Sequence, residues 1–289
     1  IAQAPNGSVY QTGVFAGRRP VPLLRWNWEG ATSRAVVDLP GRSWFTLDVA
    51  PDGAVYLPEY GQNVMCRFRP ETGKVESLGD YGRFGTHIRD VYCAMDGFVY
   101  VTATVFTTHV VVGLNPKSGE TFAVRAKADL FNGVLIKDGA GRVLVSQNRW
   151  GRPLWLELRG GSPEPVDQAE LRLTANGTAL ALPDGSYVSN LEGRMVTLMR
   201  PDGKAETFEI DRRDGPLRIF SVGAGGGRIW GGTFIPLTLF SYDPATRKSE
   251  HFGNPTETEG EIYQTVFAEG KLFIGSYVSA YLSRYTPGR

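Results

Sequence analysis

The stretch Asp52 to Gly61, DGAVYLPEYG, contains a tight-turn signal, a short apolar strand, and then an acid and an aromatic residue where the strand should end. Asp-Gly favours a hairpin turn because glycine accepts backbone angles that other residues avoid. Comparable turns followed by a strand occur in NGSVY, DGFVY, GAGRVLV, DGSYV, GGGRIW and EGKLFIG. The stretch is therefore one copy of an internal repeat.

The last glycines of these turns keep a nearly constant spacing along the whole chain. They are Gly7, Gly53, Gly97, Gly141, Gly185, Gly227 and Gly270, at intervals of 46, 44, 44, 44, 42 and 43 residues. A second, proline-containing turn follows most of them, as in RPETGK, NPKSGE, RPDGKA and DPATRK, and alternating apolar runs such as NVMCRF lie between the two turns. Seven four-stranded antiparallel units predict an all-β, seven-bladed β-propeller that occupies residues 1–289 as a single domain.

The ends of the chain do not supply a complete last repeat. Only six residues precede Gly7, and the final repeat stops after its third strand, AYLSRYTPGR. We therefore expect incomplete closure at the termini. Either the last blade has three strands, or the chain is a trimmed part of a longer polypeptide with further domains.

Composition narrows the classes of partner. The net charge is +1 and only 21% of residues are charged, so we expect no nucleic-acid partner, and no apolar run is long enough for a membrane helix. The two cysteines, Cys66 and Cys93, are predicted to be buried thiols. The chain starts at Ile1 without a methionine, which favours a processed, secreted or periplasmic protein.

The repeat also locates candidate functional residues. In a propeller, the first strand of each blade lines the central channel, and one mouth of the channel collects the start of that strand and the loop after the second strand. Equivalent offsets from the seven glycines place polar and aromatic residues at this mouth. They include Glu59, Tyr60, His87, Arg89, Gln147, Asn148, Glu261 and Tyr277.

The richest of these segments is GTHIRDV, residues 85–91. His87 and Arg89 are two residues apart, so a regular strand would direct both to the same side, toward the channel. A histidine can remove a proton near neutral pH, and an arginine can hold a carboxylate. Asp90 is expected to point the other way, into the packing between blades. The alternative is that His87 only hydrogen-bonds a neighbouring blade.

Carboxylates and phenols form a second group. Tyr60, Tyr263 and Tyr277 could each protonate a leaving oxygen or stack on a sugar, while Glu59 and Glu261 could bind substrate or act as a glycosidase pair. Solvated loop carboxylates and core tyrosines are the alternative interpretation. A third cluster, predicted to contact a polar ligand, is Gln147, Asn148, Arg149 and Trp150.

The histidine content argues against a three-histidine metal site. His109 is predicted on or near an outer strand, and His251 between the third and fourth strands of its blade. A carboxylate-rich site for calcium or manganese in the central channel stays open, beside the expectation of no cofactor.

The turn pattern resembles a broad group of bacterial propellers with DG-x-[VLI]-[YW] second strands and [DN]-P-x-[ST]-G turns. The closing stretch from FSYDPATRK to SRYTPG is the most similar part. The group includes gluconolactonase-like and virginiamycin B lyase-like proteins, and several polysaccharide lyases and glycosidases. Gluconolactonase-type members imply a metal held by Glu, Asn and Asp, here Asn132, Asn176 and Glu261. Propeller lyases of uronic-acid polymers imply a site of His, Tyr and Arg.

The leading hypothesis is a lyase that cleaves an acidic, uronic-acid-containing sugar by β-elimination. In it Arg89 or Arg149 holds the carboxylate, His87 removes the proton, and Tyr60, Tyr263 or Tyr277 protonates the leaving oxygen. Two alternatives remain. One is a non-catalytic propeller that binds a glycan, another small polar ligand or a protein, and the other is a metal-dependent lactone or ester hydrolase.

Overall fold

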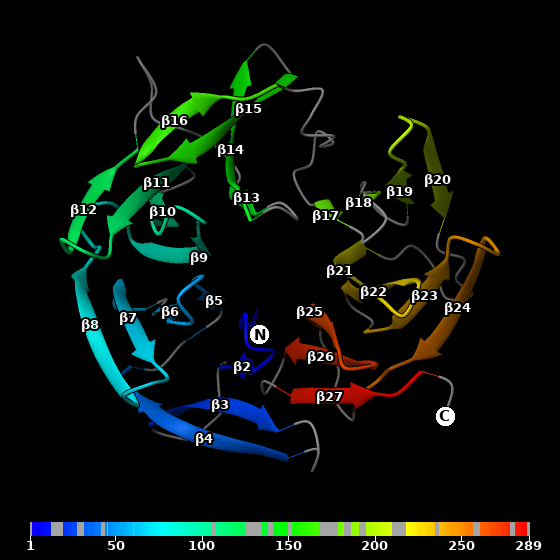
Figure 1. Cartoon of the computed structure of the whole chain (residues 1–289), viewed down its shortest axis with the longest axis horizontal. Helices are drawn as coiled ribbons and strands as arrows, with labels where there is room; N and C mark the ends of the chain where they lie inside the picture. Colours follow the sequence, from blue (N-terminus) through cyan, green and yellow to red (C-terminus); the bar gives the residue numbers. More distant parts are fainter. Residues whose placement is uncertain are drawn as a thin grey trace. The chain divides into compact units, whose positions relative to one another are not determined.

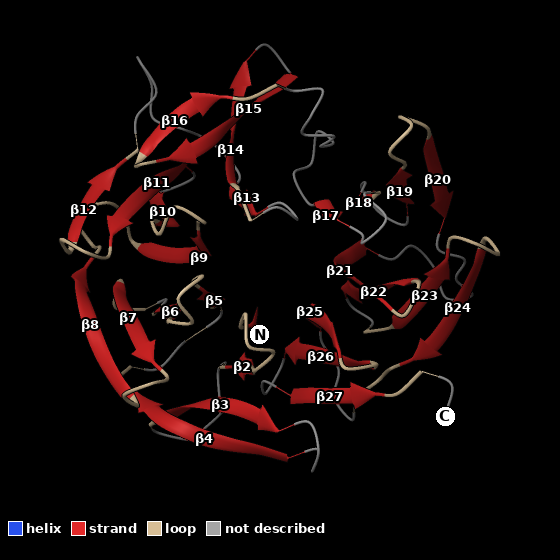
Figure 2. Cartoon of the chain, viewed as in Figure 1, coloured by secondary structure: helices blue, strands red, loops and turns tan. Residues whose placement is uncertain are grey.

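The computed structural model contains strands and turns, with no helix among the residues it describes (Figure 2). The described residues are 2–12, 20–27, 32–41, 44, 46–59, 61–105, 108–124, 135–137, 141–149, 152–167, 179–181, 186–190, 195–209, 218–234, 237–256, 261–277 and 281–287. Within them, no helix has the length and apolar character needed to cross a membrane. The chain forms two compact units, Ile1–Leu171 and Arg172–Arg289, which are described separately.

The first unit holds four sheets, each with four antiparallel strands in chain order (Figure 1). Blade 1 consists of β1 (Ala2–Gln3), β2 (Val9–Gln11), β3 (Val21–Asn27) and β4 (Thr32–Leu39). Blade 2 consists of β5 (Asp48–Val49), β6 (Val55–Pro58), β7 (Val64–Arg69) and β8 (Lys74–Asp80). Blade 3 consists of β9 (His87–Cys93), β10 (Val99–Val105), β11 (Thr108–Asn115) and β12 (Glu120–Ala123). Blade 4 consists of β13 (Leu135–Lys137), β14 (Val143–Arg149), β15 (Arg152–Arg159) and β16 (Ser162–Pro165).

The second unit continues the same pattern. Blade 5 consists of β17 (Ala179–Ala181), β18 (Tyr187–Asn190), β19 (Met195–Met199) and β20 (Ala205–Glu209). Blade 6 consists of β21 (Arg218–Gly225), β22 (Arg228–Phe234), β23 (Leu239–Asp243) and β24 (Lys248–Gly253). The described residues of blade 7 form three strands, β25 (Glu261–Ala268), β26 (Lys271–Tyr277) and β27 (Tyr281–Tyr285). Blades 6 and 7 are joined into one sheet by a single pair, Phe234 with Glu261.

The repeated glycines have the backbone geometry that the turn pattern predicts. Six of the seven have positive φ, and Gly185 lies outside the described residues. In blades 2 and 3, Gly53 (φ 87°) and Gly97 (φ 89°) sit in the turns between the first and second strands. This backbone region is strained for residues with a Cβ, so glycine recurs there. The seven-fold repeat was thus a correct guide to the blades.

Consecutive blades pack face to face within each unit. The first strands of neighbouring blades contact one another: β1 with β5, β5 with β9, and β9 with β13 in the first unit, then β17 with β21 and β21 with β25 in the second. Alternate residues of a strand serve the two faces of its sheet. In β10, Val99 and Val101 therefore join a cluster with blade 2, while Tyr100 joins a cluster with blade 4.

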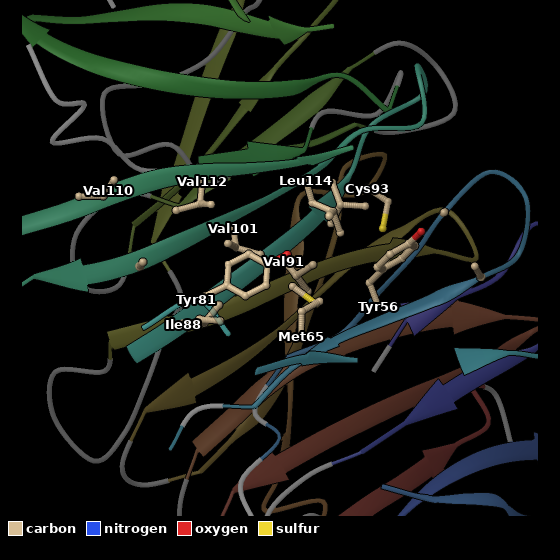
Figure 3. Packing of buried hydrophobic residues seen from close by; sticks show 14 residues of the cluster. Tyr56, Met65, Tyr81, Ile88, Val91, Cys93, Val101, Val110, Val112 and Leu114 are labelled. Atoms are coloured by element: carbon tan, nitrogen blue, oxygen red, sulfur yellow. The ribbon is translucent and has the colours of Figure 1, made fainter. Parts of the chain in front are cut away.

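The core between blades 2 and 3 illustrates this packing (Figure 3). Tyr56 and Met65 of blade 2 meet Ile88, Val91 and Val101 of blade 3, all buried. Both cysteines are buried free thiols, as expected, Cys93 in this core and Cys66 in the core between blades 1 and 2. Burial raises the pKa of the Cys66 thiol to about 11 and that of Cys93 well above its ordinary value.

Blades 5 and 6 are joined by a polar contact beside an aromatic stack. The Tyr242 hydroxyl donates a hydrogen bond to Glu206 Oε1 at 2.7 Å, and the Tyr242 and Phe208 rings stack with centroids 3.5 Å apart. The hydrogen bond from Tyr242, with help from Arg200, lowers the pKa of Glu206. Burial, followed by Glu206, raises the pKa of Tyr242 to about 12.

We expect Tyr242→Phe to lower the free energy of unfolding by about 1.5 kcal/mol at neutral pH, since the hydrogen bond is to a charged group and the stack is kept. The lowered Glu206 pKa favours the ionised native state. That stability is present above the ordinary glutamate pKa and is lost as the pH falls through the lowered value. Denaturant unfolding from neutral to acid pH should therefore show a flatter profile for the variant. Tyr285→Phe, whose hydroxyl has no hydrogen bond among the described residues, is the control.

A second test concerns the turns between third and fourth strands. Gly119 (φ 75°) and Arg247 (φ 59°) occupy equivalent positions, each donating its N–H to the carbonyl four residues earlier. Gly119→Ala should cost about 1 kcal/mol of stability through backbone strain alone, because a Cβ there would contact nothing within 4 Å. Arg247→Ala keeps an existing strain and loses only an exposed ion pair, so about 0.5 kcal/mol or less is expected in the same denaturation assay. Equal costs would contradict the strain argument.

Candidate functional site

Blade 3 presents a row of polar side chains at one end of its sheet. His87 at the start of β9 is paired with Thr104 of β10, and Thr104 is paired with His109 at the start of β11. Residues directly opposite each other in an antiparallel sheet have their side chains on the same face. Thr104 Oγ1 lies 3.4 Å from His109 Nδ1. The strand order therefore brings both histidines to one face, with a threonine between them.

A β-bulge adds a carboxylate to this face. Ile88 pairs with Ala103 and Val91 pairs with Val101, so Arg89 and Asp90 both lie opposite Thr102. The Thr102 hydroxyl donates to Asp90 Oδ2 at 2.7 Å, and the Asp90 N–H donates back to that hydroxyl at 3.3 Å. The expectation that Asp90 faces away from His87 was wrong. It assumed a regular strand, and the extra residue of a bulge changes which side chains share a face.

This polar face is directed at blade 4. The same face carries Tyr100 and Val111, which belong to a cluster with Leu135 and Val143 of blade 4. His87 is half-buried, and Arg89 is exposed. That His87 points to the channel stays a prediction. The sheet of blade 3 therefore has a polar strand end that borders the next blade.

The backbone around His87 is held in place by Thr86. Its N–H donates to the Thr104 carbonyl at 2.7 Å, and its hydroxyl donates to the same oxygen at 3.0 Å. Gly85 lies close to the same strand end, because a Cβ there would come within 2.6 Å of that carbonyl. The segment before His87 is thus fastened to the end of β10, which positions the imidazole on rigid backbone.

The same bulge recurs in the second unit. In β21, Phe220 is the extra residue between Ile219, paired with Thr233, and Ser221. In β25, Tyr263 is the extra residue between Ile262, paired with Ser276, and Gln264. In all three bulges the preceding residue is a buried isoleucine. These three first strands therefore share a bulge that inserts one additional residue beside the strand start.

Glu59 has a defined structural environment. It is only 2% exposed, and its Oε2 accepts a hydrogen bond from the Gln62 N–H in the loop between β6 and β7. Its Cγ would lie 2.8 Å from a Cβ placed on Gly41. The carboxylate thus closes its own loop and packs on a neighbouring backbone. Its contact with a ligand stays a prediction.

In the second unit the structure brings together three other predicted residues. Glu261 begins β25 and is paired with Tyr277 of β26, and it is 9% exposed. Ser221 donates a buried hydrogen bond to the Ile262 carbonyl at 2.9 Å, which fastens β25 to β21. Tyr263 follows at the bulge. Glu261, Tyr263 and Tyr277 therefore share one strand end.

The remaining predicted residues are placed only in part. Gln147, Asn148 and Arg149 end β14, paired with Leu154, Pro153 and Arg152 of β15. Tyr60, Trp150, Asn132 and Asn176 lie outside the described residues. The alternative metal set of Asn132, Asn176 and Glu261 therefore stays a prediction. Among the described residues, no group of three or more His, Cys, Asp or Glu side chains is placed to hold a metal ion.

An ionic link across three blades was not foreseen from the sequence. Asp48 of β5 accepts the Cys93 N–H of β9 at 2.7 Å and forms an ion pair with Lys137 of β13 at 2.8 Å. Beside it lies a hollow of about 420 Å³ at the turn end of the first unit, with Met95, 64% exposed, in its wall. The sequence did contain a signal for this link, because two otherwise apolar first strands each carry one charged residue, Asp48 and Lys137, and the two charges have opposite signs.

The comparisons with known proteins concern the fold. No protein-family model and no curated protein matches the chain. A solved structure described as "Streptogramin B lyase structure" matches with a TM-score of 0.67 at 10% identity, covering 98% of this chain and 91% of that one. Virginiamycin B lyase from Staphylococcus aureus matches with a TM-score of 0.63 at 11% identity, covering 98% and 92%. "YCF48 bound to D1 peptide" matches with a TM-score of 0.67 at 11% identity, covering 99% and 91%.

The chain has a β-propeller fold. Its seven blades, six of four strands and a last one of three described strands, agree with that likeness. At these sequence identities the likeness extends to the fold and no further. The residues at the strand ends of this propeller must therefore carry any argument about its chemistry.

The bulge in β9 provides a direct test of how this propeller positions its polar face. Thr102→Val keeps the side-chain shape and removes both hydrogen bonds to Asp90, so we expect a loss of about 1.5 kcal/mol in unfolding free energy and faster hydrogen exchange at the Asp90 amide. Thr197→Val is a matched control. Thr197 is buried, and its hydroxyl meets the neutral Thr207 hydroxyl at 2.9 Å. An equal or smaller loss in Thr102→Val would contradict a locking role.

Proposed function

We propose that this propeller is a lyase for an acidic, uronic-acid-containing sugar, with its site at the His87 end of blade 3. The observation that carries the proposal is the polar face itself: His87, Asp90, Thr104 and His109 lie on one face of one sheet, beside an exposed Arg89. Propellers present their ligand sites at strand ends and in the adjoining loops, where polar side chains replace the apolar residues of the middle of a blade.

The proposed reaction is a β-elimination. A uronate has an acidic C5–H beside its carboxylate, and Arg89 would bind that carboxylate and favour negative charge on it. His87 removes the C5 proton, the electron pair forms the C4=C5 double bond, and the C4–O bond breaks. The leaving oxygen takes a proton from a tyrosine, for which Tyr60, next to Glu59 in the sequence, is the candidate from the same unit.

One feature supports His87 as the base rather than His109. His87 starts the first strand, beside the bulge that places Arg89, whereas His109 lies at the second residue of the third strand. Thr104 and His109 would therefore act as positioning residues for the strand end, and His87 as the proton acceptor. The matching structures named as streptogramin B and virginiamycin B lyases support the view that this fold can serve a lyase.

A second candidate function is non-catalytic binding of a glycan or a peptide. The hollow beside Met95 favours it, since a volume of about 420 Å³ is within the usual range for ligand sites and an exposed methionine suits an adaptable contact. The match described as YCF48 bound to a peptide supports the same reading for this fold. This candidate requires saturable binding without turnover.

The lyase proposal is tested with polygalacturonate, alginate and a glucuronate-containing glycan, by following the ultraviolet absorbance of the unsaturated uronate product. His87→Gln should lower kcat by about 100-fold or more, since general-base catalysis commonly contributes that much. Arg89→Gln should mainly raise KM. His251→Gln, on exposed β24, is the control and should be indistinguishable from the unaltered protein.

Turnover that is unchanged in His87→Gln would overturn the assignment of the base. If the unaltered protein cleaves none of the polymers, calorimetry with the same polymers and with peptides decides between the two functions. Saturable binding that is weakened by Met95→Ser, but unchanged by His87→Gln, would support the binding function and reject the lyase.

A further inference from the structure

Two arginines lie directly opposite each other on blade 1. Arg25 of β3 is paired with Arg34 of β4, and Tyr10 of β2 is paired with Arg25. The three side chains therefore form a row on one face of the sheet. That face packs against blade 2, because Tyr10 belongs to the cluster that also contains Phe68, with the two rings 6.1 Å apart in an edge-to-face arrangement.

Neither guanidinium is neutralised within the described part of the chain. Arg25 and Arg34 have no ion pair and no side-chain hydrogen bond to another residue there, whereas Arg67 and Arg69 on the neighbouring blade both pair with Glu76. Like charges directly opposite each other destabilise a sheet. A pair of this kind, left without an acid, indicates a place where a negative charge from outside the chain is accommodated.

The arginine pair borders a hollow that can hold such a group. Its volume is about 310 Å³, and Tyr10, Arg25, Arg34, Phe68, Pro70 and Gly73 line it. The two aromatic rings are almost fully buried, so they form a rigid floor, while the guanidinium of Arg34 is on an exposed residue at the rim. The hollow therefore combines a fixed apolar floor with two cations that can converge on one ligand.

Glu71 is the acid that limits this site. It lies in the turn between β7 and β8, where its carboxylate is 3.7 Å from Arg69. Its negative charge acts to raise the pKa of the Tyr10 phenol, and the positive charges of Arg25 and Arg34 act to lower that pKa. Glu71 is thus close to the hollow without pairing with either arginine of the row. It would compete weakly with an anion bound there.

We propose that Arg25 and Arg34 form a binding site for a tetrahedral oxyanion, a phosphate or sulfate group, on the side of the propeller between blades 1 and 2. Guanidinium groups hold such oxygens through paired N–H donors, and two of them match the double charge of a phosphate or sulfate better than the single charge of a carboxylate. The site is separate from the His87 face of blade 3, so it does not rest on the lyase proposal.

The full chain is titrated with inorganic phosphate and with sulfate by calorimetry, at constant ionic strength set with sodium chloride so that general screening is held fixed. We expect saturable binding with a Kd of about 1 mM or tighter and an upward shift in Tm with added phosphate. Arg25→Gln and Arg34→Gln should each weaken binding at least about tenfold. Arg284→Gln, an exposed arginine on β27 without an ion pair among the described residues, is the matched control.

Glu71→Gln should change binding in the opposite direction to the arginine variants. It removes the nearest competing charge and should tighten phosphate binding by a few fold. Misfolding would only weaken binding, so it could not produce this result. A parallel titration with glucose 6-phosphate distinguishes the source of the group. Tighter binding of the ester would assign the site to a phosphorylated sugar, and tighter binding of inorganic phosphate would assign it to the free anion.

Three results would overturn the proposal. They are no saturable binding of either anion at constant ionic strength, equal binding in Arg25→Gln, Arg34→Gln and the unaltered protein, and an equal loss in Arg284→Gln. The melting temperatures of the arginine variants without added anion provide the folding check. Removing one of two opposed charges should leave Tm unchanged or raise it slightly.

Discussion

The carboxylate of Asp48 satisfies the constraint on which the arrangement of the first unit depends. In this unit the first strand of each blade has one hydrogen-bonded edge and one edge without a paired strand, and its N–H and C=O groups on that edge need partners. Asp48 accepts the Cys93 N–H from the next blade and pairs with Lys137 from the blade after that. Because the same carboxylate also accepts the Val49 N–H of its own strand, one side chain fixes the relative positions of three consecutive first strands.

With the first strands held in this way, blade-to-blade packing follows from strand alternation. One face of β10 supplies Val99, Val101 and Ala103 to the core with blade 2, and the other supplies Tyr100 to the core with blade 4. At the strand ends the sheet no longer needs this apolar packing, so polar groups are easily accommodated there. The polar face of blade 3 lies at such an end, which is why His87 and Thr104 can be accommodated without disturbing the core.

The sequence predicts features that repeat along the whole chain better than features that depend on a single residue. The blades follow from a period of about 44 residues marked by turn glycines such as Gly53 and Gly97, and the six of these glycines that the structure describes have the expected backbone angles. The described part of the last blade has three strands, which is one of the two outcomes expected from the incomplete final repeat. Side-chain direction in the first strands was not anticipated, because a bulge of a single residue changes it and leaves no mark in the composition. Asp90 was therefore not expected on the same face as His87, although its expected place between blades agrees with the direction of that face.

Long-range pairs were missed for a different reason. The opposition of Arg25 and Arg34 depends on the register between two strands, and the contact of Asp48 with Lys137 depends on the order of three blades. Neither can be read from residues that are adjacent in the sequence. In contrast, the pairing of Glu261 with Tyr277 could be anticipated, since they lie nine residues before and seven residues after the same turn glycine, Gly270.

The bulges suggest how a repeated fold acquires different chemistry in different blades. In β9, β21 and β25 a buried isoleucine fixes the strand, and the bulge adds a position whose occupant the core does not select. That position follows the isoleucine directly and holds Arg89, Phe220 and Tyr263 in turn, a cation, an apolar ring and a phenol. A packing residue would be expected to keep one character at equivalent positions. The variation at this position, next to the buried isoleucine that these three strands share, is instead expected where the core does not select the residue.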